Sequence, residues 1–304
     1  MAKQIVFNAD NQNKLHTFYI DFDLSDTGEL EQVKEEFYNT LFEDIPNFAF
    51  GRRQVEKRLN NNTNIVRISR EALKKIYSIP EIKEASDYYL NNNEVEDKYL
   101  KKGEFGELIL YHFLHHYFQA ESLISKIYFK DSNNLAAHGF DAVHVNESNR
   151  ELWLGESKLY QDGNSAIREL VNDLKAHFNR DFFNSEFTII NNRVQDDDAE
   201  LDDFMKTLIS PETLCLDKLA NIKIALFAGF TSKHISNRNK FKDKDTFDKE
   251  LSKESIDLLN SLNQKKDSHA WVNYLDIYLF LFPLNDKKEL VKDLHIKLKG
   301  AQQI

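Results

Sequence analysis

The most constraining feature of the sequence is the almost uninterrupted apolar segment IKIALFAGF at residues 222–230. A strand that is apolar at nearly every position is typical of the centre of a parallel sheet, where both faces are covered. The chain before it contains an apolar helix at 103–119, strands at 123–129, 140–145 and 151–160, and an amphipathic helix at 165–178. This order predicts an α/β fold with a mixed αβββαβ core flanked by helices.

Regular structure is also predicted on both sides of this core. Residues 16–24 alternate between apolar and polar side chains, which indicates a half-buried strand. Helical spacing of apolar residues predicts a helix over 28–43, and Ser69 resembles the N-cap of a helix that ends before Pro80. After the core we expect a long helix at 246–264, a strand near 272–282 and a terminal helix.

The polar, asparagine-rich stretch at 90–102 is the most linker-like part of the chain. We therefore predict two units. Residues 1–98 form an N-terminal accessory region, and residues 99–304 form the domain that carries the chemistry and ends in a C-terminal extension. The accessory elements at both ends are expected to be α/β.

Composition predicts a cytoplasmic protein. The single cysteine, Cys215, cannot form an internal disulfide and fits a reducing compartment. The N-terminus lacks the apolar stretch of a signal peptide, and no apolar run approaches the roughly 20 residues of a membrane span. The best candidate, YLDIYLFLFPL, is interpreted as a buried strand, and no membrane partner is expected.

The charge is unevenly distributed around a formal net value of −10. A negative net charge argues against strong unaided binding to nucleic acid, because contacts with phosphate dominate the affinity of proteins for nucleic acid. Basic blocks occur at 51–59, 67–75 and 232–244, and an acidic block at 196–203. Each fits a solvated face; the alternative is phosphate contact for the basic blocks and a partner-facing or self-masking surface for the acidic one.

Two charged residues, Glu156 and Lys158, interrupt the otherwise apolar strand at 151–160. If residues 147–150 form a four-residue turn, Asp141 lies opposite Glu156, and all three side chains share one face. Two carboxylates that close repel each other, and a hard divalent ion such as Mg²⁺ removes the repulsion. A slip of one residue in the register would send Asp141 to the other face.

Further residues complete the predicted site. The Lys158 ammonium could position the attacking water or neutralise charge on a phosphate. Glu107 is preferred over Glu104 as an inward carboxylate from the first helix, because Glu104 fits a first-turn acid favoured by the helix dipole. The competing interpretation is that Glu156 and Lys158 form an ordinary solvated pair.

Other chemistries find less support in the sequence. The nearby histidines His112, His115 and His116 are interpreted as core or edge residues, because no matching distal ligand set is apparent. No CxxC motif indicates structural zinc, and no GxxxxGK[ST] loop indicates an ATPase.

The motifs GEFGEL at 103–108, GFD at 139–141 and GESK at 155–158 resemble those of the PD-(D/E)xK nuclease superfamily. Residues 103–230 follow its αβββαβ order, although Phe140 stands where the superfamily's name has proline. More narrowly, residues 100–180 look like the HamA family, the nuclease subunits of Hachiman antiphage systems.

The resemblance implies DNA cleavage supported by Mg²⁺, with Mn²⁺ as a possible substitute. It implies Asp141 and Glu156 as metal ligands and Lys158 as the catalytic lysine; Glu107 and Ser157 complete our predicted metal-binding set, and Glu107 also our catalytic set. It further implies a partner, the superfamily 2 helicase HamB, which holds the nuclease in check. Two alternatives stay open: an RNA-cleaving member of the same fold, and a catalytically silent regulatory subunit of a helicase complex.

Overall fold

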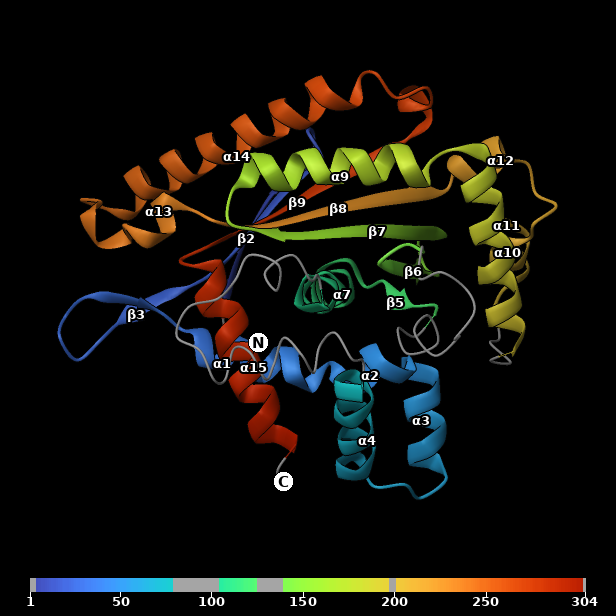
Figure 1. Cartoon of the computed structure of the whole chain (residues 1–304), viewed down its shortest axis with the longest axis horizontal. Coiled ribbons are helices and arrows are strands. Elements are labelled where there is room, and N and C mark those ends of the chain that lie inside the picture. Colours follow the sequence, from blue (N-terminus) through green and yellow to red (C-terminus); the bar gives the residue numbers. More distant parts are fainter. Residues whose placement is uncertain (1–3, 79–103, 125–138, 197–200, 303–304) are drawn as a thin grey trace.

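The computed structural model describes residues 4–78, 104–124, 139–196 and 201–302. Its centre is a seven-stranded mixed sheet (Figure 1). In spatial order the strands are β1 (Ile5–Asp10), β2 (Leu15–Ile20), β9 (Asp276–Leu284), β8 (Ile222–Thr231), β7 (Glu151–Tyr160), β6 (Ala142–Asn146) and β5 (Glu121–Ser122). A separate two-stranded hairpin joins β3 (Phe22–Leu24) to β4 (Leu30–Gln32).

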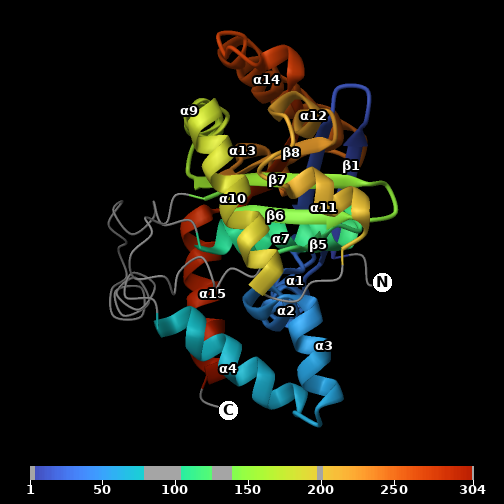
Figure 2. The ribbon, with the colours of Figure 1, turned by 90° about the vertical axis from the view of Figure 1, so that its right-hand side faces the viewer.

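Helices cover both faces of the large sheet, as Figures 1 and 2 show. One face carries α9 (Gly163–His177) and α14 (Lys244–Lys266). The other carries α7 (Glu104–Phe118), α1 (Lys34–Glu43), α2 (Ile45–Phe50) and α15 (Lys287–Gln302), with α3 (Arg52–Asn60) and α4 (Ile65–Ser78) packed further out. At one end of the sheet lie α10 (Arg180–Asp196), α11 (Asp203–Ile209) and α12 (Cys215–Leu219). The short helices α13 (Lys233–Ser236), η1 (Arg238–Lys240) and η2 (Val272–Tyr274) lie in connections.

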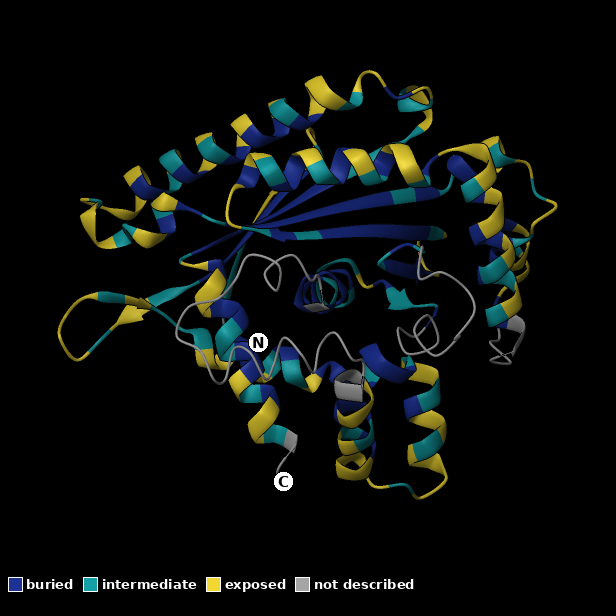
Figure 3. Ribbon diagram, viewed as in Figure 1, coloured by how far each residue is buried: buried dark blue, intermediate teal, exposed yellow. Residues whose placement is uncertain are grey.

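The apolar segment at 222–230 is the central strand that its sequence predicts. As β8 it pairs in parallel with both β7 and β9. Its alternate side chains enter different cores: Ile224 and Leu226 pack on the α9 side, and Ala225 and Phe227 on the α7 side. Figure 3 shows the buried centre that results. The mixed α/β class is thus confirmed. Among the described residues, α7, β6, β7, α9 and β8 follow the expected order, with α10, α11 and α12 inserted before β8.

Helix α7 packs tightly against β7 because glycine stands at the contact. A Cβ atom at Gly155 would lie 2.7 Å from Cδ2 of Leu110 and 2.9 Å from Cβ of Ala142. Gly106 of α7 in turn lies against Ser157, since its Cβ would be 3.3 Å from the Ser157 Oγ. These close approaches fix the helix over the middle of β7.

Several predicted elements outside the core are wrong in detail. The strand at 16–24 is two strands, and β2 is buried at all six positions rather than half-buried, because it lies between β1 and β9 inside the sheet. The helix at 28–43 begins only at Lys34, since residues 30–32 pair with β3. Ser69 is no N-cap: it lies within α4, where its Oγ donates to the carbonyl oxygen of Ile65 at 2.9 Å.

The C-terminal elements are confirmed as α14, β9 and α15. The linker at 90–102 and the boundary between residues 98 and 99 fall outside the described residues, as does most of the strand expected at 123–129; β5 precedes it at Glu121–Ser122. Strands β1 and β2 of the N-terminal region belong to the same sheet as β8 and β9.

Candidate metal and catalytic site

The hairpin that carries the predicted site has the register expected from the sequence. Val143 pairs with Leu154 across β6 and β7, and residues 147–150 form the turn. The ladder ends at Ala142 and Gly155, however, so Asp141 does not pair with Glu156 as predicted. Instead the Asp141 carboxylate accepts hydrogen bonds from the backbone N and the Oγ of Ser157, both at 2.9 Å. The chain leaves the sheet at Asp141, and its side chain replaces a backbone acceptor.

Glu156 and Lys158 point toward α9, where each meets a side chain of opposite character. Glu156 Oε1 lies 2.5 Å from Nδ1 of His177, and Lys158 forms an ion pair with Asp173. Two residues along a strand span about 6.6 Å. Four residues along a helix span about 6 Å. Because α9 runs antiparallel to β7 and the two spacings are similar, the Glu156–His177 and Lys158–Asp173 pairs can form together.

The Glu156 carboxyl is strongly perturbed. It is 2% exposed, and burial raises its pKa to about 8, although the hydrogen bond with His177 opposes the shift. The charges of Asp141 and Asp173 raise the pKa further. An acid in such surroundings gains from any nearby cation. Negative charge is therefore in excess around Glu156.

Lys158 is the cation that the chain itself supplies. Burial alone would lower the pKa of its ammonium, but Asp173, Asp141 and Glu156 together raise it above its usual value. Its side chain is 24% exposed, so the ammonium lies at the edge of the buried cluster rather than inside it. Lys158 is therefore charged at neutral pH and within reach of a ligand from solvent.

Ser157 and Glu107 lie on the other side of the strand. Ser157 alternates with Glu156 and Lys158 along β7, and its Oγ faces Gly106 of α7. Glu107 follows Gly106 in that helix and is half-buried. The structure thus groups Asp141, Glu156 and Lys158, and it holds Glu107 on the helix that covers the opposite face of β7.

The donor set around Glu156 fits a hard divalent ion. Its carboxylates are oxygen ligands of the kind that Mg²⁺ and Mn²⁺ prefer. Asp141 approaches β7 from the end of the β6 ladder, and Glu156 lies on the α9 face of β7. Both carboxylates raise the pKa of Lys158. Of the predicted residues, Asp141 and Glu156 are therefore the two best placed to hold the ion.

Sequence reasoning missed Asp173 and His177. They stand four residues apart in α9, next to its buried apolar residues, and so share one helical face. A polar pair with that spacing, opposite a Glu-x-Lys strand, was the available signal.

A second polar cluster lies on α7. His112 Nδ1 is 2.7 Å from Oδ2 of Asp44, and His116 Nε2 is 3.1 Å from both carboxylate oxygens of Asp44. His112 is buried, and His115 and His116 are half-buried, as the core-or-edge interpretation predicts. The expectation that no distal ligand accompanies these histidines was wrong. Asp44, at the junction of α1 and α2 and 68 residues before His112, lies beside them.

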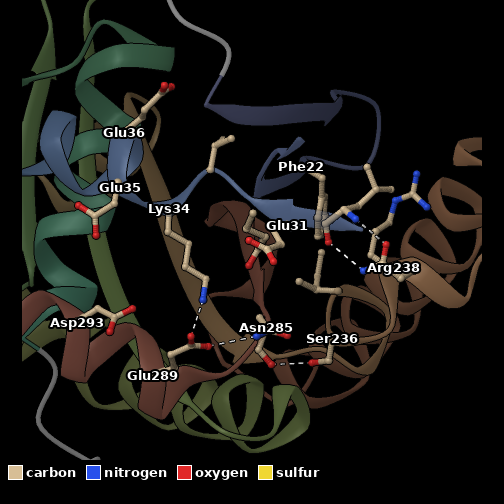
Figure 4. A pocket seen from close by; sticks show the side chains of 15 residues that line it. Phe22, Glu31, Lys34, Glu35, Glu36, Ser236, Arg238, Asn285, Glu289 and Asp293 are labelled. Carbon is tan, nitrogen blue, oxygen red and sulfur yellow. Dashed lines mark hydrogen bonds and ion pairs between the residues drawn. The ribbon is translucent and has the colours of Figure 1, made fainter. Parts of the chain in front are cut away.

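Charged residues of the first basic block pair with acidic side chains outside the cluster around Glu156. In the first basic block, Arg52 pairs with Glu56 and Glu121, and Arg53 pairs with Glu147, which fits the solvated-face interpretation. Figure 4 shows a separate pocket between α1, η1 and α15, with Lys34 paired to Glu289. Most of its charged lining residues are acidic, which suits no phosphate: Glu31, Glu35, Glu36, Glu289 and Asp293, against Lys34 and Arg238.

Comparison with known proteins decides the family. The model of the HamA protein family matches residues 2–298, nearly the whole chain. The chain belongs to the HamA family. HamA proteins are components of Hachiman antiphage defence systems, so this chain is a Hachiman defence protein. A search of curated protein sequences found no match. Among the helices of the described residues, none is long and apolar enough to cross a membrane.

Proposed function

We propose that the chain is the metal-dependent DNA nuclease of its Hachiman system, with a PD-(D/E)xK type of site. The observation that carries the proposal is the convergence of Asp141, Glu156 and Lys158 on one short stretch of β7. A buried carboxylate costs several kcal/mol unless it is compensated. A bound divalent ion offers that compensation.

Each residue has a separate role in this proposal. Asp141 and Glu156 hold Mg²⁺, or Mn²⁺ in its place. Ser157, which Asp141 contacts, and Glu107 lie on the α7 side of β7 and stay predictions as further ligands. The ion, when bound, supplies charge stabilisation at the phosphodiester and its leaving group. The Lys158 ammonium, charged and partly exposed, neutralises negative charge that develops on the phosphate.

The contacts from α9 give Asp173 and His177 positioning roles. His177 holds one oxygen of Glu156, and Asp173 holds the Lys158 ammonium. Partners behind metal ligands commonly affect metal affinity. Because of these contacts, a DNA phosphate must compete with Asp173 for Lys158, and the ion must compete with His177 for Glu156. An enzyme built this way has low activity until substrate is delivered.

A helicase partner follows from the family and from the charge. Hachiman systems contain more than one component, and the net charge of −10 limits unaided binding to DNA. We propose that a HamB-like superfamily 2 helicase binds the chain and controls access of DNA to β7. The accessory elements at both ends of the chain, outside residues 103–230, are the candidate contact regions.

The test is cleavage of plasmid DNA and of RNA by the purified chain, alone and with the co-expressed helicase. The proposal predicts DNA cleavage with Mg²⁺ or Mn²⁺ and none with a chelator. Cleavage of RNA alone would support the RNA-cleaving alternative. No cleavage of either substrate, with or without the helicase, would show a silent regulatory subunit.

A further inference from the structure

The polar cluster on α7 has the composition of a second metal site. Asp44, His115 and His116 each offer one ligand atom, and these atoms all lie within 4.8 Å of one another. In a tetrahedral zinc site with bonds of about 2.0–2.2 Å, ligand atoms are roughly 3.3–3.6 Å apart. The observed separation of 3.1 Å between His116 Nε2 and the Asp44 oxygens is already close to that value. Small side-chain movements would complete the site.

The surrounding contacts orient these three residues as ligands. His115 Nδ1 is 3.4 Å from Oε1 of Glu121, which leaves its Nε2 for an ion. His112 lies beside His116, and its Nδ1 is 2.7 Å from Oδ2 of Asp44, so its ring N–H donates to the carboxylate. Carboxylate partners behind a histidine ligand and hydrogen bonds to a carboxylate ligand are regular features of zinc sites.

The contact between His115 and Glu121 is loose. The His115 Nδ1 and the Glu121 Oε1 are 3.4 Å apart, and neither Nδ1 nor the other Glu121 oxygen, Oε2, makes a hydrogen bond in the described structure. A metal at His115 would fix its tautomer, so that Nδ1–H donates to Glu121.

We propose that Asp44, His115 and His116 bind a transition-metal ion, with Zn²⁺ as the best match. Two imidazoles and one carboxylate suit zinc rather than magnesium, and three ligands leave a fourth position for water. The site is separate from the Asp141 cluster, because α7 covers the opposite face of β7 from Glu156. It does not depend on the proposed nuclease activity.

The ion would tie two distant parts of the chain together. Asp44 lies at the junction of α1 and α2, and the histidines lie in the C-terminal half of α7. The N-terminal half of α7 contacts Ser157 through Gly106. Zinc would therefore link the junction of α1 and α2 to α7, the helix that packs on β7. The free energy of zinc binding would add to the stability of the fold.

The experiment titrates Zn²⁺ into the chelator-treated full chain with Mg²⁺ in excess, and follows calorimetric heat and melting temperature. Co²⁺ replaces Zn²⁺ in a parallel titration read by visible absorption. We expect one equivalent of Zn²⁺ to bind and to raise the melting temperature. His115→Gln should weaken binding at least tenfold, and so should Asp44→Asn.

Two controls separate this site from others. His234→Gln, a half-buried histidine on α13, and the double variant Asp141→Asn with Glu156→Gln should both bind Zn²⁺ like the wild type. Circular dichroism confirms that each variant is folded, and Asp44→Asn serves if His115→Gln is not. Absence of binding to the wild type, or equal binding by the wild type and the folded ligand variant, would overturn the proposal.

Discussion

Two buried carboxyl groups, one on each side of the sheet, both contact histidine, but their pKa values shift in opposite directions. Glu156 faces α9 with one imidazole and two further carboxylates nearby, and its pKa rises to about 8, with burial as the main cause. Asp44 faces α7, where burial would also raise its pKa, but contacts with His112 and His116 lower it. The oxygen-rich surroundings of Glu156 call for a hard cation from outside. The nitrogen-rich surroundings of Asp44 stabilise its charge directly and suit a softer ion.

The largest expected effect is a difference in plasmid cleavage between variants of Glu156 and of Asp44. Glu156→Gln should reduce plasmid cleavage at least 100-fold and leave the melting temperature unchanged or higher, because it removes a costly buried charge and keeps a partner for His177. Asp44→Asn should leave cleavage within a few-fold of the wild type at a temperature where both are folded. A large drop in melting temperature for Glu156→Gln would instead mark Glu156 as a structural residue.

For the free energy of unfolding the order reverses: substitution of Asp44 should cost more stability than substitution of Glu156. Asp44→Ala leaves His112 and His116 facing a gap, and the loss of a buried hydrogen-bond partner costs roughly 1–3 kcal/mol. Urea denaturation measures this change, and the exposed Asp26→Ala is the control, expected within about 0.5 kcal/mol. Equal midpoints for Asp44→Ala and Asp26→Ala would show that the α7 cluster does not stabilise the fold.

His177 should affect the metal requirement more than the maximal rate. His177→Gln loses the imidazole that holds Glu156, and such partners typically change metal affinity by about 10–100-fold. We expect about a tenfold higher Mg²⁺ concentration for half-maximal cleavage, with a smaller loss of rate at saturation. His234→Gln is the matched control. A loss of maximal rate with an unchanged Mg²⁺ requirement would contradict the positioning role.

The smallest effect is a pH dependence of stability in the absence of divalent ions. Glu156 ordinarily has a pKa of 4.5, but burial raises it to about 8 in the fold. Across that window the folded state binds more protons than the unfolded state, so this group makes the fold less stable as pH rises. The raised pKa of His177, where the bond to Glu156 outweighs burial, acts in the same direction. The melting-temperature advantage of Glu156→Gln should therefore grow from pH 5 to pH 9; a constant difference would contradict the buried-acid interpretation.

Local patterns were enough to predict part of this structure. The apolar run of β8 and the turn at 147–150 define the central strand and the hairpin register, because strand side chains alternate with a period of two. Alternation also placed Glu156 and Lys158 on one face. These features depend on residues that are close in sequence.

Contacts between distant residues could not be predicted in this way. Asp44 reaches His112 across 68 residues, and β2 pairs with β9 near the other end of the chain. Asp141 was expected in the ladder, but the Ser157 amide and hydroxyl hold its side chain at the strand edge instead. No periodicity encodes where a strand stops pairing when a side chain can replace the backbone acceptor.

The most direct test of the central claim compares two lysines in equivalent surroundings. Lys158 and Lys223 each project from a strand of the sheet, each pairs with an aspartate, and each side chain is 24% exposed. Plasmid cleavage with Mg²⁺ should fall at least 100-fold in Lys158→Ala and stay within a few-fold of the wild type in Lys223→Ala. If both variants cut at the wild-type rate, or both lose activity together with their fold, Lys158 is a structural ion-pair residue and the catalytic assignment is wrong.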